Sequence, residues 1–270
     1  MDDQGGQVAE HNAVRSRWGW TWLDWFAIAL PIGLIAVLLA VYFIDREFYL
    51  TYVIEPLRRE HQAVEIVTFG FLLASVPLLL VSVRNQWARR DEPGGRQALI
   101  VIALVLGAAA FAAGEEVDWG DTYFGWTDEG GELEDVYALN VHNNLSVKTL
   151  GSAFLMAVFF GLPLLWASRN RWRLPAGLRP AVAEWPVVFA MAVAFGWRQL
   201  KNIYLLIVGK ENVGVYGDGG FYWGFIEQIN EHKEMLIAVA IFLYALYRIR
   251  ATKPVNAMAN DECTNVEKGG

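Results

Sequence analysis

The sequence predicts an all-α integral membrane protein, a polytopic bundle of about six transmembrane helices. Hydrophobic residues make up 55% of the 270 residues, and the mean hydropathy of the chain is positive. These residues are gathered into long blocks, which is typical of membrane proteins. A helix that rises about 1.5 Å per residue needs roughly 20 residues to cross about 30 Å of hydrocarbon, and several blocks approach that length.

Three blocks are clearly long and apolar enough to span, and three reach spanning length only when further ionisable residues are included. The apolar blocks are residues 22–44, 63–83 and 150–167. The others are residues 98–113, 186–208 and 235–247, the first continuing through Glu116 and the last extending back towards Glu227. Because a short apolar run is also typical of a re-entrant or interfacial helix, five and seven crossings are alternatives to six.

Lysine and arginine residues predict the orientation of the bundle. If the N-terminus, residues 84–96, residues 169–179 and the C-terminus lie on one side, that side holds 14 of the 22 basic residues. Basic connecting segments stay in the cytoplasm, so the N-terminus and the C-terminus are predicted to be cytoplasmic. The longest outer segment, residues 115–147, carries nine carboxylates and no lysine or arginine.

The chain is predicted to form one transmembrane helical domain, residues 21–250, with outer loops at residues 115–147 and 209–226. A polar cytoplasmic arm, residues 1–20, precedes this domain, and a disordered cytoplasmic tail, residues 251–270, follows it. The arm is not followed by a short apolar core with a cleavage site. The first helix is therefore expected to stay in the cell membrane, which we take to be the inner membrane of a bacterium.

Composition excludes two classes of function. The net charge is −7 and the basic residues are scattered between apolar blocks, so nucleic acid is not an expected partner. Cys263 is the only cysteine, which rules out an intramolecular disulfide and any cysteine-based metal or redox motif. The expected partner is the lipid bilayer.

Two smaller features predict how the helices pack and end. The run of glycine and alanine at residues 107–114 lets other helices approach closely, so we expect the third helix to be central. Asp24 and Glu184 stand near the cytoplasmic ends of the first and fifth helices. We expect their side chains to reach out to water.

Ionisable residues gather where the outer ends of the helices are predicted. The glutamates of this set are Glu65, Glu115, Glu116, Glu227, Glu231 and Glu234. Arg198 and Lys201 lie about one turn apart in the outer half of the fifth helix. A charge in hydrocarbon costs at least about 2.5 kcal/mol, so these groups are expected to face inward and to pair. The acids outnumber the two cations, so some acids must be protonated, solvated or bound to a cation.

Acid–base chemistry and metal binding are both compatible with this set. The candidate catalytic residues are Glu115, Glu116, Glu231, His142, Arg198 and Lys201. The candidate metal ligands are Glu65, Glu116, His142, Glu227, Glu231 and His232, a mixture that suits Zn²⁺, Mn²⁺ or Fe²⁺. The sequence has no HExxH motif. The ligands would come from separate helices, so a metal-free site, with histidines bonded to neighbours or water, stays open.

One segment resembles a known pattern. It runs from Gly114-Glu-Glu-Val-Asp-Trp-Gly-Asp to Trp126 and is followed by Asn140-Val-His-Asn. It is similar to a set of uncharacterised bacterial multi-pass membrane proteins in which a helix ends in Gly-Glu-Glu-x-Ser-Trp-Gly-Gln before a later Asn-x-His-Asn. Asp118 replaces the serine and Asp121 the glutamine. The resemblance implies a membrane location and no particular activity, and an amphipathic elbow at the membrane surface explains the segment equally well.

Three functions fit these observations. The first is an intramembrane enzyme that acts on a lipid or lipid-linked substrate, with Arg198 and Lys201 holding an anionic head group. The second is a proton- or cation-coupled transporter that uses the same carboxylates. The third is a non-catalytic membrane subunit or assembly factor in which buried ion pairs fix the register of the helices. The sequence does not set the oligomeric state.

Overall fold

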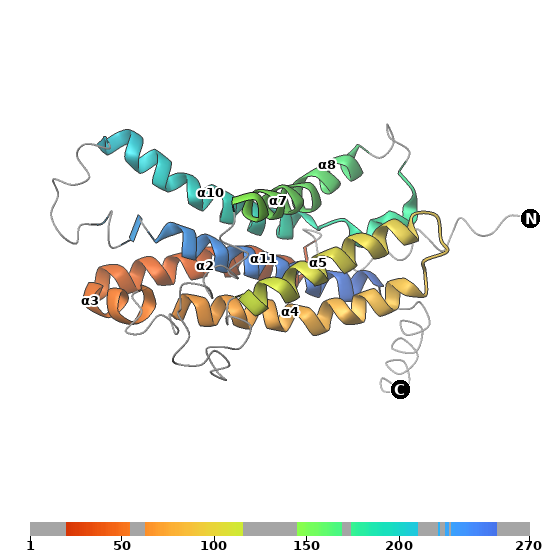
Figure 1. Cartoon of the computed structure of the whole chain (residues 1–270), viewed down its shortest axis with the longest axis horizontal. Helices are drawn as coiled ribbons and strands as arrows, with labels where there is room; N and C mark the ends of the chain where they lie inside the picture. The colour runs from red at the N-terminus through yellow and green to blue at the C-terminus, as the bar shows by residue number, and fades with distance from the viewer. Residues whose placement is uncertain are drawn as a thin grey trace, which may run out of the picture.

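The computed structural model of the chain describes residues 20–54, 63–115, 145–168, 174–209, 221, 225–226 and 228–252. Every regular element in these residues is helical. The long helices are α2 (Trp22–Ile44), α4 (Ala63–Trp87), α5 (Gly95–Glu115), α7 (Leu145–Met156) with α8 (Leu162–Ala167), α10 (Trp185–Val208) and α11 (Ile229–Thr252). They form an elongated bundle with their axes roughly along its length (Figure 1). Most of the predicted arm, tail and outer loops lie outside the described residues.

Four helical segments are long and apolar enough to cross a membrane. They are Trp22–Ile44, Ala63–Trp87, Gly95–Gly114 and Thr149–Ala167. The helical class and the membrane character predicted from the sequence are confirmed at this level. Helices α10 and α11 have 24 residues each, a length of about 36 Å, but they carry ionisable residues. Six crossings therefore stay a prediction, as does the orientation.

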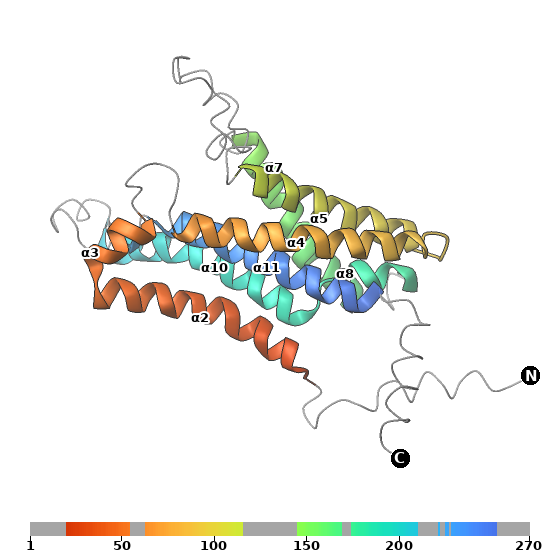
Figure 2. The same cartoon turned by 90° about the horizontal axis from the view of Figure 1, so that it is seen from below.

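Helix α11 is the central helix of the bundle. It packs against α4, α10, α2 and α5, and both views show it enclosed by neighbouring helices (Figures 1 and 2). Four consecutive residues, Ala238 to Ile241, are buried. Successive residues are spaced about 100° apart around a helix, so four buried in a row leave no exposed side.

The expectation that the third helix is central was wrong. In α5 the buried residues form one stripe, Ala98, Ile102, Val105, Ala109 and Ala113, and the residues between them are exposed or half-buried. Gly107 meets no atom within 4 Å of the position that a Cβ would take. The small residues of this helix therefore allow close approach on one face only.

Prolines inside the helices do not interrupt them. Helices α2 and α4 continue through Pro31 and Pro77. Pro163, which has no N–H to donate, follows a π-helical turn, η5 (Ala157–Gly161), that joins α7 to α8. The turn carries the buried ring of Phe159, whose centroid lies 5.3 Å from that of Tyr244 in α11.

Four segments meet at one end of the bundle, which we call the basic end. They are the start of α2, the turn between α4 and α5, residues 174–184 and the last turns of α11. The Gly177 N–H donates to the Pro93 carbonyl at 3.0 Å, and a Cβ on Gly177 would lie 2.3 Å from that oxygen. This contact therefore requires glycine. Three of these segments, the α4–α5 turn, residues 174–184 and the last turns of α11, carry basic residues that were predicted to lie on one side of the membrane. The structure places these residues at one end of the bundle.

We expect this end to face the cytoplasm. In a Cys263→Ser background, Asp91→Cys in the exposed α4–α5 turn should escape an impermeant thiol reagent in intact cells and react after permeabilisation. Glu129→Cys, in the predicted outer loop, should react in intact cells. Labelling of position 91 from outside would reverse the orientation.

Candidate functional site

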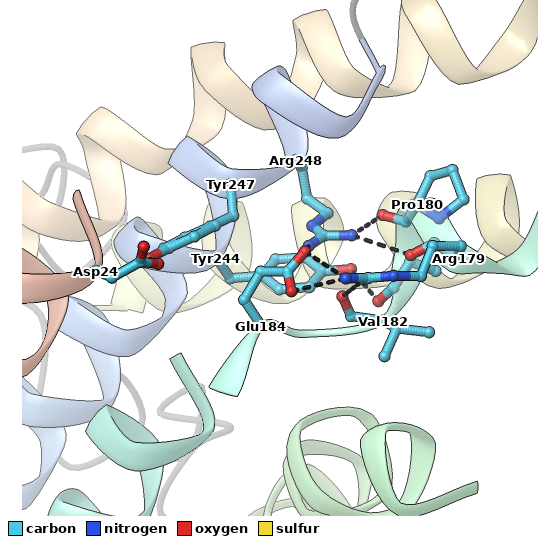
Figure 3. Close-up of polar contacts among 9 residues, drawn as sticks. Asp24, Arg179, Pro180, Val182, Glu184, Tyr244, Tyr247 and Arg248 are labelled. Carbon is cyan, nitrogen blue, oxygen red and sulfur yellow. Dashed lines mark hydrogen bonds and ion pairs between the residues drawn. The ribbon is translucent and has the colours of Figure 1, made fainter. Parts of the chain in front are cut away.

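Helix α11 carries a polar cluster at each end. The first, at the basic end, is the Arg248 cluster, which comprises Asp24, Arg179, Glu184, Tyr244, Tyr247 and Arg248 (Figure 3). The Arg248 side chain has no exposed surface and lies 3.6 Å from a Glu184 oxygen. Its Nη1 donates to the carbonyls of Pro180 and Arg179. A buried guanidinium is stable only with such partners.

The segment before α10 supplies these partners because its carbonyls are not used within a long helix. Residues Ala176–Ala181 form a short 3₁₀ helix, η6. Its last carbonyls face α11, where Tyr244 donates to the Ala181 carbonyl at 2.9 Å. Arg179 donates to both Glu184 oxygens, at 2.9 and 2.7 Å. Glu184 thus lies between two guanidinium groups, in the geometry drawn in Figure 3.

Asp24 connects the first helix to the same cluster. It forms a capping box with Thr21 at the start of α2, a common helix-start arrangement. Its Oδ1 also accepts a 2.6 Å hydrogen bond from the Tyr247 hydroxyl. Asp24 and Glu184 are therefore structural partners of α11, and the expectation that they simply reach out to water was wrong.

The second cluster lies at the opposite end and is centred on His232. We define the His232 cluster as Tyr42, Tyr49, Trp197, Phe221, Phe225 and His232. Tyr49, in the π-helical turn η1 (Tyr49–Ile54), lies 2.8 Å through its hydroxyl from Nε2 of the fully buried His232. The ring of His232 lies 5.0 Å from Phe225 and 6.5 Å from Trp197.

Three aromatic rings, those of Tyr49, Trp197 and Phe225, lie around the His232 ring. Burial, with a smaller contribution from Tyr42, raises the pKa of the Tyr49 phenol well above its usual range, so the hydroxyl keeps its hydrogen. His232 Nδ1 and Trp197 Nε1 are buried without a hydrogen-bond partner among the described residues. This cluster therefore has unused hydrogen-bonding capacity.

The predicted site residues are distributed unevenly around the His232 cluster. Glu65 and Glu231 are half-buried in the first turns of α4 and α11. Lys201 is half-buried one turn beyond Trp197 on the same face of α10. Arg198 is exposed, so its side chain does not have the inward orientation that we expected. The two cations of α10 thus differ in their surroundings.

The remaining predicted residues cannot be placed in this geometry. Helix α5 ends at Glu115, and Glu116, His142 and Glu227 lie outside the described residues, together with most of the Gly-Glu-Glu motif. Within the described part of the chain, no group of three histidine, cysteine, aspartate or glutamate residues could hold a metal ion. His232 already bonds Tyr49 through Nε2.

The fold and its two polar clusters define an α-helical protein with four candidate membrane-spanning helices. Comparisons with protein-family models, with curated proteins and with solved structures gave no match to this chain.

Loss of the carboxylate beside the buried Arg248 should lower the free energy of unfolding more than loss of the carboxylate beside the exposed Arg89. Glu184→Gln leaves Arg248 and Arg179 close together without their carboxylate, so it should lower the free energy of unfolding by about 3 kcal/mol. Glu92→Gln removes the partner of Arg89, which lies in the exposed α4–α5 turn at 2.9 Å, and should cost less than about 1 kcal/mol. Unfolding of the purified protein in detergent measures both, and equal losses would contradict the structural role of the buried pair.

Proposed function

We propose that this protein is a multi-pass enzyme of the bacterial inner membrane, with about six spans and both termini in the cytoplasm, that acts on a lipid or lipid-linked substrate at the outer end of the bundle. The basic end is then the cytoplasmic end. The His232 cluster and the half-buried Glu65, Lys201 and Glu231 then lie near the outer surface. This arrangement brings acid–base groups to the depth of lipid head groups and upper acyl chains.

The observation that carries the proposal is the buried hydrogen bond between Tyr49 and His232, 2.8 Å long. Apolar residues would fill this part of the bundle at lower cost, because each buried polar group must be desolvated. Imidazole and phenol are common general acids and bases. Their pairing in an aromatic environment supports a chemical role more than a purely structural one.

A lipid substrate is supported by the surface beside the cluster. Phe43, Ile44 and Phe48, at the end of α2 and in the short helix α3 (Arg46–Phe48), are largely exposed. In a membrane this surface contacts acyl chains. Lys201 adds a positive charge that could attract an anionic head group. A substrate arriving laterally through the lipid would therefore meet apolar surface first and polar groups next.

The two alternatives differ in their support. A proton- or cation-coupled transporter needs polar groups along a path, but the middle of the central helix is apolar from Leu236 to Leu243. A non-catalytic membrane subunit is favoured by one observation, the buried ion pair between Arg248 and Glu184, which fixes α11 against the segment before α10. That pair also serves an enzyme that needs a rigid scaffold.

Activity should depend on His232. The purified protein is reconstituted in vesicles made from the total lipid extract of its expression host, and the lipids are compared by mass spectrometry before and after incubation. The wild-type protein should produce a new lipid species. Removing a general acid or base typically costs about 10² to 10⁴ in rate, so His232→Ala should slow its formation at least about 100-fold.

Trp185→Phe provides the control, because Trp185 is exposed at the start of α10, about 18 Å along the helix from Trp197, and it should leave the rate unchanged. Elemental analysis of the same preparation identifies bound Zn, Mn or Fe, any of which would favour hydrolysis as the reaction. If the wild-type protein changes no lipid, or if His232→Ala is fully active, the proposed enzyme is ruled out and the transporter and the non-catalytic subunit are the alternatives.

A further inference from the structure

Two nitrogen atoms of the His232 cluster, on neighbouring rings, have no hydrogen-bond partner within the described part of the chain. They are His232 Nδ1 and Trp197 Nε1, both shielded from solvent, and the centroids of the two rings lie 6.5 Å apart. A buried polar atom without a partner costs about 1–3 kcal/mol. Two such atoms, on rings that lie close together, therefore indicate a missing group.

The Tyr49 hydroxyl indicates which histidine nitrogen carries the hydrogen. Among the described residues, its hydrogen bond is to His232 Nε2. A buried O–H that lacks an acceptor is costlier than an unused lone pair, so we assign Tyr49 as the donor and Nε2 as the acceptor. A neutral imidazole has one N–H, which then lies on Nδ1. Because an indole nitrogen can only donate, both unpartnered atoms are donors.

The surroundings determine the charge of the missing group. Phe225 lies within 6.1 Å of both Trp197 and His232, measured between ring centroids. It stacks on Phe221 at 5.3 Å, and Phe221 stacks at 5.9 Å on the exposed Phe43. A charged group would lose its hydration among these rings. Two N–H donors in such an environment therefore suit an oxygen atom that is uncharged.

We propose that the His232 cluster binds an uncharged acceptor oxygen between Trp197 Nε1 and His232 Nδ1. Two sources supply this chemistry, a buried water molecule and the ester carbonyl of a lipid acyl chain. A water needs at least two polar partners, and both are present. A carbonyl oxygen has two lone pairs and would accept from both donors, as in an oxyanion-type site. Only the lipid source rests on the proposed function.

The test measures whether the indole N–H of Trp197 is hydrogen-bonded. The ultraviolet resonance Raman spectrum of the Trp197→Phe variant, subtracted from that of the wild-type protein, isolates Trp197. It is recorded in vesicles of diester phosphatidylglycerol and phosphatidylethanolamine and in vesicles of the dialkyl-ether analogues, which lack the carbonyl. The indole band should be shifted from that of 3-methylindole in an apolar solvent, which has a free N–H. Trp185→Phe serves as the matched subtraction control.

The outcomes separate the two sources. A hydrogen-bonded indole in both lipids identifies water, and a hydrogen-bonded indole in the diester lipid alone identifies the acyl carbonyl. A free indole in diester vesicles overturns the proposal, whatever the lipid assay of the proposed enzyme shows. A second measurement remains if Trp197→Phe does not fold. His232→Asn, whose amide N–H replaces Nδ1–H, should then melt at a higher temperature than His232→Leu, and the reverse order overturns the proposal.

Discussion

The burial of Arg248 in the last turns of the central helix is the interaction on which the arrangement of the basic end depends. A guanidinium without exposed surface must find a carboxylate and several acceptors inside the protein. Helix α11 obtains them from Glu184 and from the carbonyls of residues 179 and 180. These contacts hold the segment before α10 against α11. Through Tyr247 and Asp24, the same helix holds the start of α2.

The two ends of α11 use polar residues differently. At the basic end, carboxylates, guanidinium groups, hydroxyls and carbonyls are paired with one another, which stabilises the helix packing. At the opposite end, His232 and Tyr49 are paired, but Nδ1 of the histidine and the nearby indole nitrogen of Trp197 have no partner among the described residues. The basic end therefore serves mainly the packing of the helices, whereas the unpartnered donors among the described residues of the His232 cluster are consistent with chemistry at the other end.

Much of the fold follows from the sequence because spanning length and hydropathy are local properties. The first helix has the predicted bounds, residues 22–44, and a helix lies over each of the other predicted blocks. The central position of α11 could not be predicted in this way. Its apolar block was the shortest of the six, and its burial arises from packing on all sides by helices that are distant in the sequence.

The site was predicted less completely because it also depends on contacts between helices that are distant in the sequence. Glu65, Lys201 and Glu231 were selected by their expected depth, and the structure finds them half-buried. Arg198 was expected to face inward because a charge in hydrocarbon is costly. Depth alone, however, does not give the direction of a side chain around its helix. Tyr49 and Trp197 were not selected, because an aromatic residue near a membrane interface is ordinarily an anchor. Only the tertiary contact with His232 distinguishes them.

Helix α11, as the central helix, should be shielded from lipid around its whole circumference. Spin labels placed one at a time from Leu236 to Ala245, with the protein in lipid vesicles, report the accessibility of each position to molecular oxygen, which concentrates in the hydrocarbon. We predict uniformly low accessibility along α11, in contrast to high accessibility at Leu73 and Leu80 of α4, which are exposed. A periodic rise every three to four residues along α11 would show that one face contacts lipid, and this result would contradict the account.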